Sequence, residues 1–115
     1  MRSLLAALLL CLPLSSQAAQ RLVTDSFDIT IDVRCEEGVV GCDKVHYTGV
    51  HRKTGRSIKL VGQERHTRCA DGVTPCRFLG YAFRNGNVIY AVWDDGTLSV
   101  KQGERVLVEE RGVWQ

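Results

Sequence analysis

The residues most able to do chemistry in this sequence are its cysteines. Five are present: Cys11 lies in an apolar N-terminal stretch, and the other four form two blocks, CEEGVVGC (35–42) and CADGVTPC (69–76). In an exported chain an even number of cysteines indicates disulfides. Four cysteines allow three pairings, and the repeated spacing favours the two local pairs Cys35–Cys42 and Cys69–Cys76. Zinc would need reduced thiolates and tighter cysteine pairs.

The histidines and carboxylates form no catalytic pattern. His46 and His51 are five residues apart on one expected strand, so they face opposite sides and are poorly placed to share a metal ion. Asp94 and Asp95 precede a glycine, as a hairpin turn requires. No serine occupies a nucleophile elbow, and no glycine-rich phosphate loop precedes a helix. We therefore predict a protein that is not an enzyme and that needs no metal or cofactor.

The N-terminal residues 1–18 have the anatomy of a secretory signal peptide. Arg2 provides the positive start, the run Leu4–Leu12 the apolar segment, and Ser16–Ala18 a small-x-small cleavage site. The apolar run is shorter than the roughly 20 residues that a membrane-spanning helix needs. Lipidation at Cys11 would require a small residue before it, and Leu10 is large. We expect cleavage after residue 18 and a mature protein in the periplasm or outside the cell, without a transmembrane segment.

The remaining residues, 19–115, are of the size of one domain. The formal net charge of the whole chain is +2, and one of these charges is Arg2 in the signal peptide. A nearly neutral chain with interspersed charges gives no reason to propose nucleic acid or an anionic membrane as a partner. A chain this short has a small core, so we expect the two disulfides to contribute to its stability.

The pattern of apolar residues predicts an all-β fold. Apolar and polar residues alternate through residues 27–33, which is typical of a strand with one face in water. Three turns centred on Gly86, Gly96 and Gly103 divide the C-terminal part into a meander. We predict about seven to eight strands in a small antiparallel β-barrel or sandwich, with the barrel favoured because closure removes exposed edges. The expected strands are 27–33, 44–52, 57–62 with an extension to 68, 77–84, 87–93, 97–101 and 105–110.

Two turns are candidate recognition sites. The first is the Cys69–Cys76 loop, which carries Asp71 and is followed by Arg77; the second is the turn that contains Asp94 and Asp95. Rigid exposed loops commonly carry binding residues. The strand 87–93 is apolar on both faces, so it is either covered on both or presents one face to a partner. Trp114 either packs over a barrel end or serves as an exposed anchor.

The C-terminal meander resembles the periplasmic and membrane-bound inhibitors of c-type lysozyme, which are small eight-stranded barrels. Their signature has the form Ser-Gly-x-x-Tyr, then a hairpin, then Trp-x-Lys-Gly. The matching text here is LGYAF (79–83) and WDDG (93–96). Gly80, Trp93 and Gly96 match, and Phe83 replaces the tyrosine. The resemblance covers about a quarter of the chain and implies the same barrel architecture.

The resemblance does not extend to the inhibitory contact. In that family the Ser and Lys enter the acidic lysozyme cleft, and here Leu79 and Asp95 occupy those positions. A carboxylate in place of a cation would be repelled by an acidic cleft. We therefore expect an exported binding protein, in its sharpest form an inhibitor or immunity-type protein against another cell-wall-directed hydrolase. The alternatives are an envelope structural or stress-associated protein without a tight partner, and a binder of a small ligand or metal in the barrel mouth.

Overall fold

The computed structural model describes residues 19–115, and all of its regular secondary structure is β. The expected signal peptide and Cys11 lie outside the described residues. The strands are β1 (Gln20–Val23), β2 (Phe27–Val33), β3 (Val45–His51), β4 (Ser57–Arg68), β5 (Pro75–Asn85), β6 (Val88–Trp93), β7 (Thr97–Gln102), β8 (Arg105–Arg111) and β9 (Val113–Trp114).

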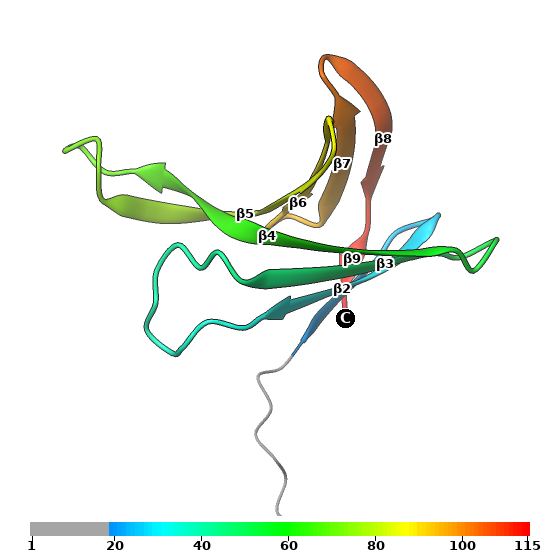
Figure 1. The fold of residues 1–115 in the computed structure, drawn as a ribbon, viewed down its shortest axis with the longest axis horizontal. Coiled ribbons are helices and arrows are strands. Elements are labelled where there is room, and N and C mark those ends of the chain that lie inside the picture. Colours follow the sequence, from blue (N-terminus) through cyan, green and yellow to red (C-terminus); the bar gives the residue numbers. More distant parts are fainter. Residues whose placement is uncertain (1–18) are drawn as a thin grey trace, which may run out of the picture.

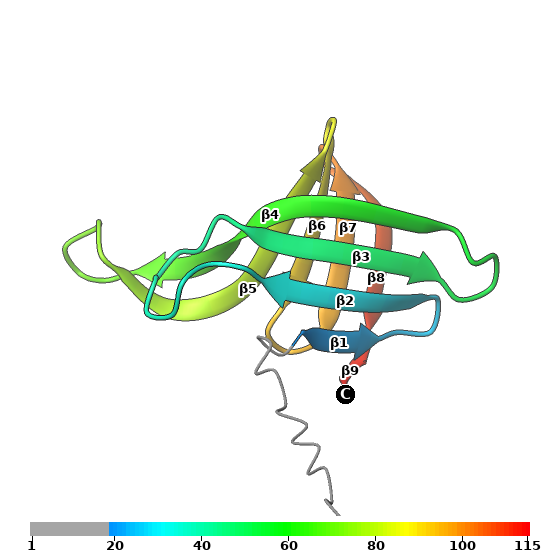
Figure 2. The ribbon, with the colours of Figure 1, turned by 60° about the horizontal axis from the view of Figure 1, so that its bottom comes forward.

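The strands form one antiparallel sheet in the order β8-β7-β6-β5-β4-β3-β2-β1-β9. The sheet curls on itself, so that β1 to β4 cross β6 to β8 at a steep angle and form two layers (Figures 1 and 2). β4 is the longest strand and pairs with β3 along its first half and with β5 along its second. It changes partners at Gly62, where any side chain would overlap the Ala82 carbonyl oxygen.

The space between the layers is filled by apolar side chains that alternate along the strands, as the period of two requires. The buried core contains Leu22, Ile29, Ile31, Cys42, Val45, Tyr47, Tyr81, Phe83, Val92, Leu98 and Val100. Aromatic rings form its centre, because Tyr47 lies 5.1 Å from Phe83 and 5.7 Å from Tyr90 between ring centroids. The ring of Tyr47 lies over Gly49 on the same strand, and an added Cβ at Gly49 would be 2.5 Å from the Tyr47 hydroxyl.

The last strands bring the two edges of the sheet together and make it a nearly closed barrel. β8 pairs with β7, and after a single residue, Gly112, the chain continues as β9 and pairs with β1. A side chain at Gly112 would be 2.3 Å from the Val23 carbonyl oxygen, so only glycine allows this close approach. Glu110 adds a side-chain link, since its carboxylate accepts hydrogen bonds from the hydroxyls of Thr24 (2.7 Å) and Ser26 (2.6 Å).

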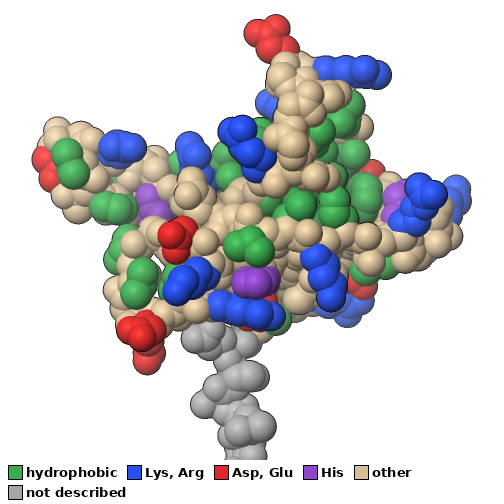
Figure 3. Space-filling model, in the orientation of Figure 1, with side chains coloured by type: hydrophobic (Ala, Val, Ile, Leu, Met, Phe, Trp, Pro, Cys, Tyr) green, Lys and Arg blue, Asp and Glu red, His purple; other side chains and the backbone are tan. Residues whose placement is uncertain are grey.

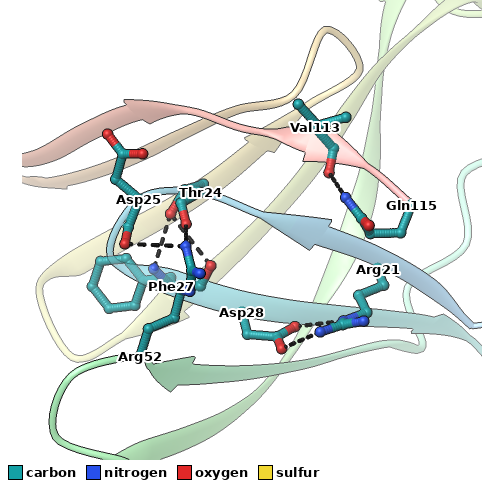
Figure 4. A network of polar contacts seen from close by, with 8 residues as sticks. All are labelled: Arg21, Thr24, Asp25, Phe27, Asp28, Arg52, Val113 and Gln115. Carbon is teal, nitrogen blue, oxygen red and sulfur yellow. Dashed lines mark hydrogen bonds and ion pairs between the residues drawn. The ribbon is translucent and has the colours of Figure 1, made fainter.

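The β1–β2 turn is also held by a residue at the end of the neighbouring strand β3 (Figure 4). Arg52, just after β3, donates a hydrogen bond from Nη1 to the Thr24 carbonyl oxygen at 2.8 Å. Arg21 and Asp28 form a bidentate ion pair between β1 and β2, with N–O distances of 2.9 and 2.6 Å. These contacts hold the part of the barrel that lies away from the disulfide-bonded loops.

The structure confirms the predicted all-β antiparallel fold, and it corrects the strand count to nine. The two unpredicted strands are β1 and β9. β1 has four residues and β9 has two, which is too short for an alternating pattern to be recognised. β9 is defined by its pairing with β1, at the other end of the described chain, and such long-range pairing leaves no local signal.

Candidate binding site

Both predicted disulfides are present. Cys35 and Cys42 bridge the β2–β3 loop with their Cα atoms 5.9 Å apart, and Cys69 and Cys76 bridge the β4–β5 hairpin at 5.1 Å. Figures 1 and 2 show the two loops projecting on the same side of the barrel. Two disulfide bonds fit a periplasmic or extracellular compartment, where thiols are oxidised.

The Cys35–Cys42 loop is attached to the core. Cys42 has no exposed surface and belongs to the buried cluster. Its backbone N–H donates to Glu64 Oε1 at 2.8 Å, and its carbonyl oxygen accepts from the Glu64 N–H at 2.8 Å. The second half of β4 therefore supports the end of this loop.

The β4–β5 hairpin extends well beyond the barrel. We call residues 63–79 the arm: β3 pairs with β4 only as far as Gly62, and β6 pairs with β5 only from Gly80 onward. Half-buried rings continue from the core into its base, since the ring of Phe78 lies 5.1 Å from that of Tyr81 and 5.5 Å from that of His66. The register of the arm shifts on both sides of His66, which indicates bulges.

The tip of the arm is ordered by Asp71. Its Oδ1 accepts hydrogen bonds from the N–H groups of Val73 (2.9 Å) and Thr74 (2.8 Å), and its Oδ2 accepts one from the Thr74 hydroxyl. These bonds, with that from the Thr74 side chain the strongest, lower the pKa of Asp71 to about 2. Arg68 Nη1 donates to the Gly72 carbonyl oxygen at 3.2 Å across the same tip. The carboxylate predicted to contact a partner therefore also holds the loop in shape.

A hollow of about 290 Å³ lies between the two disulfide-bonded loops. It is bordered by Gly41 from the first loop, by residues 63–68 of β4, and by Val73 and Pro75 from the arm tip. The two loops carry three exposed valines: Val39 (50% exposed) and Val40 (64%) on the first, and Val73 (75%) on the second. Figure 3 shows such apolar groups on both projections, with basic, acidic and histidine side chains between them.

The Asp94–Asp95 turn is a separate feature of the surface. The Asp94 N–H donates to the Leu79 carbonyl oxygen, and the Asp94 carbonyl oxygen accepts from Trp114 Nε1, both at 2.9 Å. Asp95 Oδ1 accepts from the Thr97 N–H at 2.9 Å, and hydrogen bonds from the Thr97 side chain and backbone lower the pKa of Asp95. Both aspartates are exposed. Trp114 is half-buried against the core, so it packs over this end of the barrel.

The four predicted binding residues thus lie in two places. Asp71 and Arg77 belong to the arm, whereas Asp94 and Asp95 lie at the β6–β7 turn near its base. Among the described residues no hydrogen bond or ion pair joins one pair to the other. The exposed valines were not predicted as site residues, although the repeated pattern places a valine after the glycine of both loops, at positions 39 and 73.

The residues of the lysozyme-inhibitor resemblance lie on neighbouring strands. Gly80 is directly opposite Trp93, and an added side chain at Gly80 would be 2.3 Å from the Val92 carbonyl oxygen. Gly96 has a φ of +94° in the following turn. The matching glycines are therefore explained by backbone geometry in this meander. The two residues that differ from the family signature, Leu79 and Asp95, lie close together. Leu79 ends the arm, and its carbonyl oxygen accepts a hydrogen bond from the N–H of Asp94, the residue before Asp95.

Within residues 19–115 no three histidine, cysteine, aspartate or glutamate side chains gather where they could hold a metal ion. His51 lies at the far turn, where its Nδ1 accepts from the Lys53 N–H at 3.2 Å. None of the described residues forms a helix long and apolar enough to cross a membrane. No protein-family model matches the chain, and comparisons with curated proteins and with solved structures return no significant match.

Proposed function

We propose that this is an exported, non-catalytic binding protein that blocks a cell-wall-directed hydrolase in the Gram-negative envelope. The observation that carries the proposal is the placement of two disulfide-bonded loops on one side of a nearly closed barrel, with a hollow between them. A blocking protein needs a stiff scaffold and projecting groups that lose little entropy on binding. The barrel is the scaffold, and the two loops are the projecting groups.

The chemistry of the loops supports a protein as the partner. Val39, Val40 and Val73 are all at least half exposed on short, stapled segments. Exposed apolar groups ringed by polar side chains are typical of protein-binding surfaces. The hollow is open and shallow, which suits a loop of a partner better than an enclosed small molecule.

A hydrolase is the proposed target because of the compartment and the meander. The resemblance to lysozyme inhibitors supports a partner of that class, and the carboxylate at Asp95 argues for a different contact from the one that family uses. In this proposal the arm and the Cys35–Cys42 loop make the main contact. The Asp94–Asp95 turn lies near the base of the arm and contributes at the margin.

The test uses oxidised protein containing residues 19–115, immobilised and offered a panel of purified lysozymes and other peptidoglycan hydrolases. We expect one hydrolase to be retained at a stoichiometric ratio in high salt and to lose its lytic activity in a turbidity assay. An unrelated all-β protein of similar size and charge is the control. Retention no greater than on this control, with full lytic activity of every enzyme, would contradict the proposal and favour a structural role in the envelope.

A further inference from the structure

One edge of the arm is an unpaired strand. β3 pairs with β4 up to the residue pair Val45–Gly62. On the same side of β4, the Cys42 carbonyl oxygen accepts a hydrogen bond from the Glu64 N–H. Backbone groups alternate in direction along a strand, so the N–H and C=O groups of His66 face this same edge. Beyond Glu64 neither strand pairing nor a loop hydrogen bond in the described chain covers it. The hollow between the two loops lies along these residues.

The opposite edge of the arm is protected. β5 begins at Pro75, which has no N–H to donate. The Leu79 carbonyl oxygen accepts from the Asp94 N–H, so this edge is blocked at both of its ends. Proteins commonly block their exposed strand edges in these ways. The contrast singles out the β4 edge as the one left able to pair.

The charged side chains of the arm itself are unbalanced. The two ion pairs within residues 19–115 are Arg21–Asp28 and Arg34–Asp32, and neither is on the arm. The arm's own carboxylates are engaged, since Glu64 accepts from the Cys42 N–H and Asp71 holds the tip. Its arginines, Arg65, Arg68 and Arg77, are exposed and have no carboxylate partner in the described chain.

We propose that the β4 edge between Gln63 and Arg68 binds an extended, acidic segment of the target protein as an added strand. Main-chain hydrogen bonds to His66 would supply affinity, and alternate side chains of the added strand would give specificity. Arg65 and Arg68 differ by an odd number of positions and so point to opposite faces of β4. Acidic side chains on either face of the segment would therefore meet an arginine. This inference deepens the proposed function and rests on it for the identity of the target.

The probe is a capped peptide of nine residues that alternates glutamate with threonine and valine. It is titrated into ¹⁵N-labelled protein of residues 19–115, and amide chemical shifts are followed by NMR. We expect the largest shifts at residues 63–68 and slower hydrogen exchange of the His66 amide once the peptide is bound. Two control peptides are used, one with lysine for every glutamate and one with alternate N-methylated amides. Both should fail to bind, because one reverses the charge and the other removes the donors of the ladder.

Charge reversal on the protein gives a second measurement. Arg65→Glu should weaken peptide binding at least tenfold, because it places a like charge beside the acidic segment. Arg105→Glu, an exposed arginine at the start of β8, is the matched control and should leave binding unchanged. The proposal would be overturned by any of three results. These are equal affinity for the lysine peptide, chemical-shift changes confined to other residues, and no binding up to about 5 mM peptide.

The outcomes separate this inference from the proposed function. If a hydrolase is captured and Arg65→Glu captures it equally well, the edge-strand inference is wrong and the inhibitor proposal stands. If the acidic peptide binds at residues 63–68 and no hydrolase is captured, the edge is a binding site and the hydrolase proposal is wrong. Binding of anionic lipid vesicles without binding of the peptide would assign the arginines to a membrane surface and overturn the inference.

Discussion

The two disulfide-bonded loops share the spacing Cys-x-acid-Gly-Val-x-x-Cys, yet they differ in what lies beneath them. The first closes onto the core, with Cys42 completely buried and bonded to Glu64 through two hydrogen bonds. The second closes the tip of an arm, where every residue from Asp71 to Arg77 is exposed. The same eight-residue spacing therefore occurs once in a loop that is packed against the barrel core and once in a loop that is not. The first loop is part of the scaffold, and the second belongs to the proposed contact surface.

The largest expected difference is the effect of removing each disulfide. By the loop-entropy estimate, either eight-residue loop contributes about 2.5 kcal/mol. Replacing Cys35 and Cys42 with alanine also leaves a cavity in the core, so we expect a loss of about 3–5 kcal/mol in the free energy of unfolding.

Replacing Cys69 and Cys76 with alanine should cost less than about 2.5 kcal/mol, because the freed arm can loosen without exposing the core. Urea unfolding followed by tryptophan fluorescence measures both variants. Equal losses would show that the two staples are equivalent and would contradict the comparison.

A smaller effect is expected where the two regions meet. Glu64 lies at the base of the arm and accepts the Cys42 N–H. Glu64→Ala leaves that part-buried donor without its partner, and we expect a loss of about 1–3 kcal/mol. Glu64→Gln keeps an acceptor in place and is the matched control, with a loss well below that of alanine. The thermal midpoint of unfolding measures both, and similar midpoints for alanine and the parent protein would show that Glu64 does not link the loop to the arm.

The smallest effect is local and depends on pH. The pKa of Asp71 is about 2 in the folded protein, below its ordinary value of 3.8. A lowered folded-state pKa means that the hydrogen bonds of this carboxylate contribute fully above about pH 4 and are lost as the pH falls through about 2. We expect the amide signals of Val73 and Thr74 to shift with that midpoint in NMR spectra while the core signals stay unchanged. A midpoint near 3.8 would show that the carboxylate does not hold the tip.

Local sequence signals are sufficient for the meander from β5 to β8. Turns at Gly86, Gly96 and Gly103 and the alternation between them place β5 to β8 within one or two residues at most ends. The repeated cysteine spacing was sufficient for both disulfide pairs. Where a hydrogen bond or an alternation involves residues close in the chain, the pattern is visible in the sequence.

The features that define the candidate site depend on contacts between distant residues. Burial of Cys42 requires β4 to pass beneath the loop, and the open edge of β4 exists because β3 ends earlier than β4 does. Neither follows from composition or spacing. The charges of Asp71 and Arg77 are visible in the sequence, whereas the roles of Glu64 and the exposed valines depend on that pairing and leave no local signal.

The most direct test of the account compares two exposed valines. Val73 is 75% exposed at the arm tip, and Val106 is 51% exposed on β8 of the barrel. Affinity for a captured hydrolase is measured by calorimetry for Val73→Asp and for Val106→Asp, after circular dichroism has shown that both variants are folded. The account predicts at least a tenfold loss of affinity for Val73→Asp and none for Val106→Asp. Unchanged affinity of Val73→Asp, or an equal loss in both variants, would contradict the claim that the disulfide-bonded arm is the contact surface.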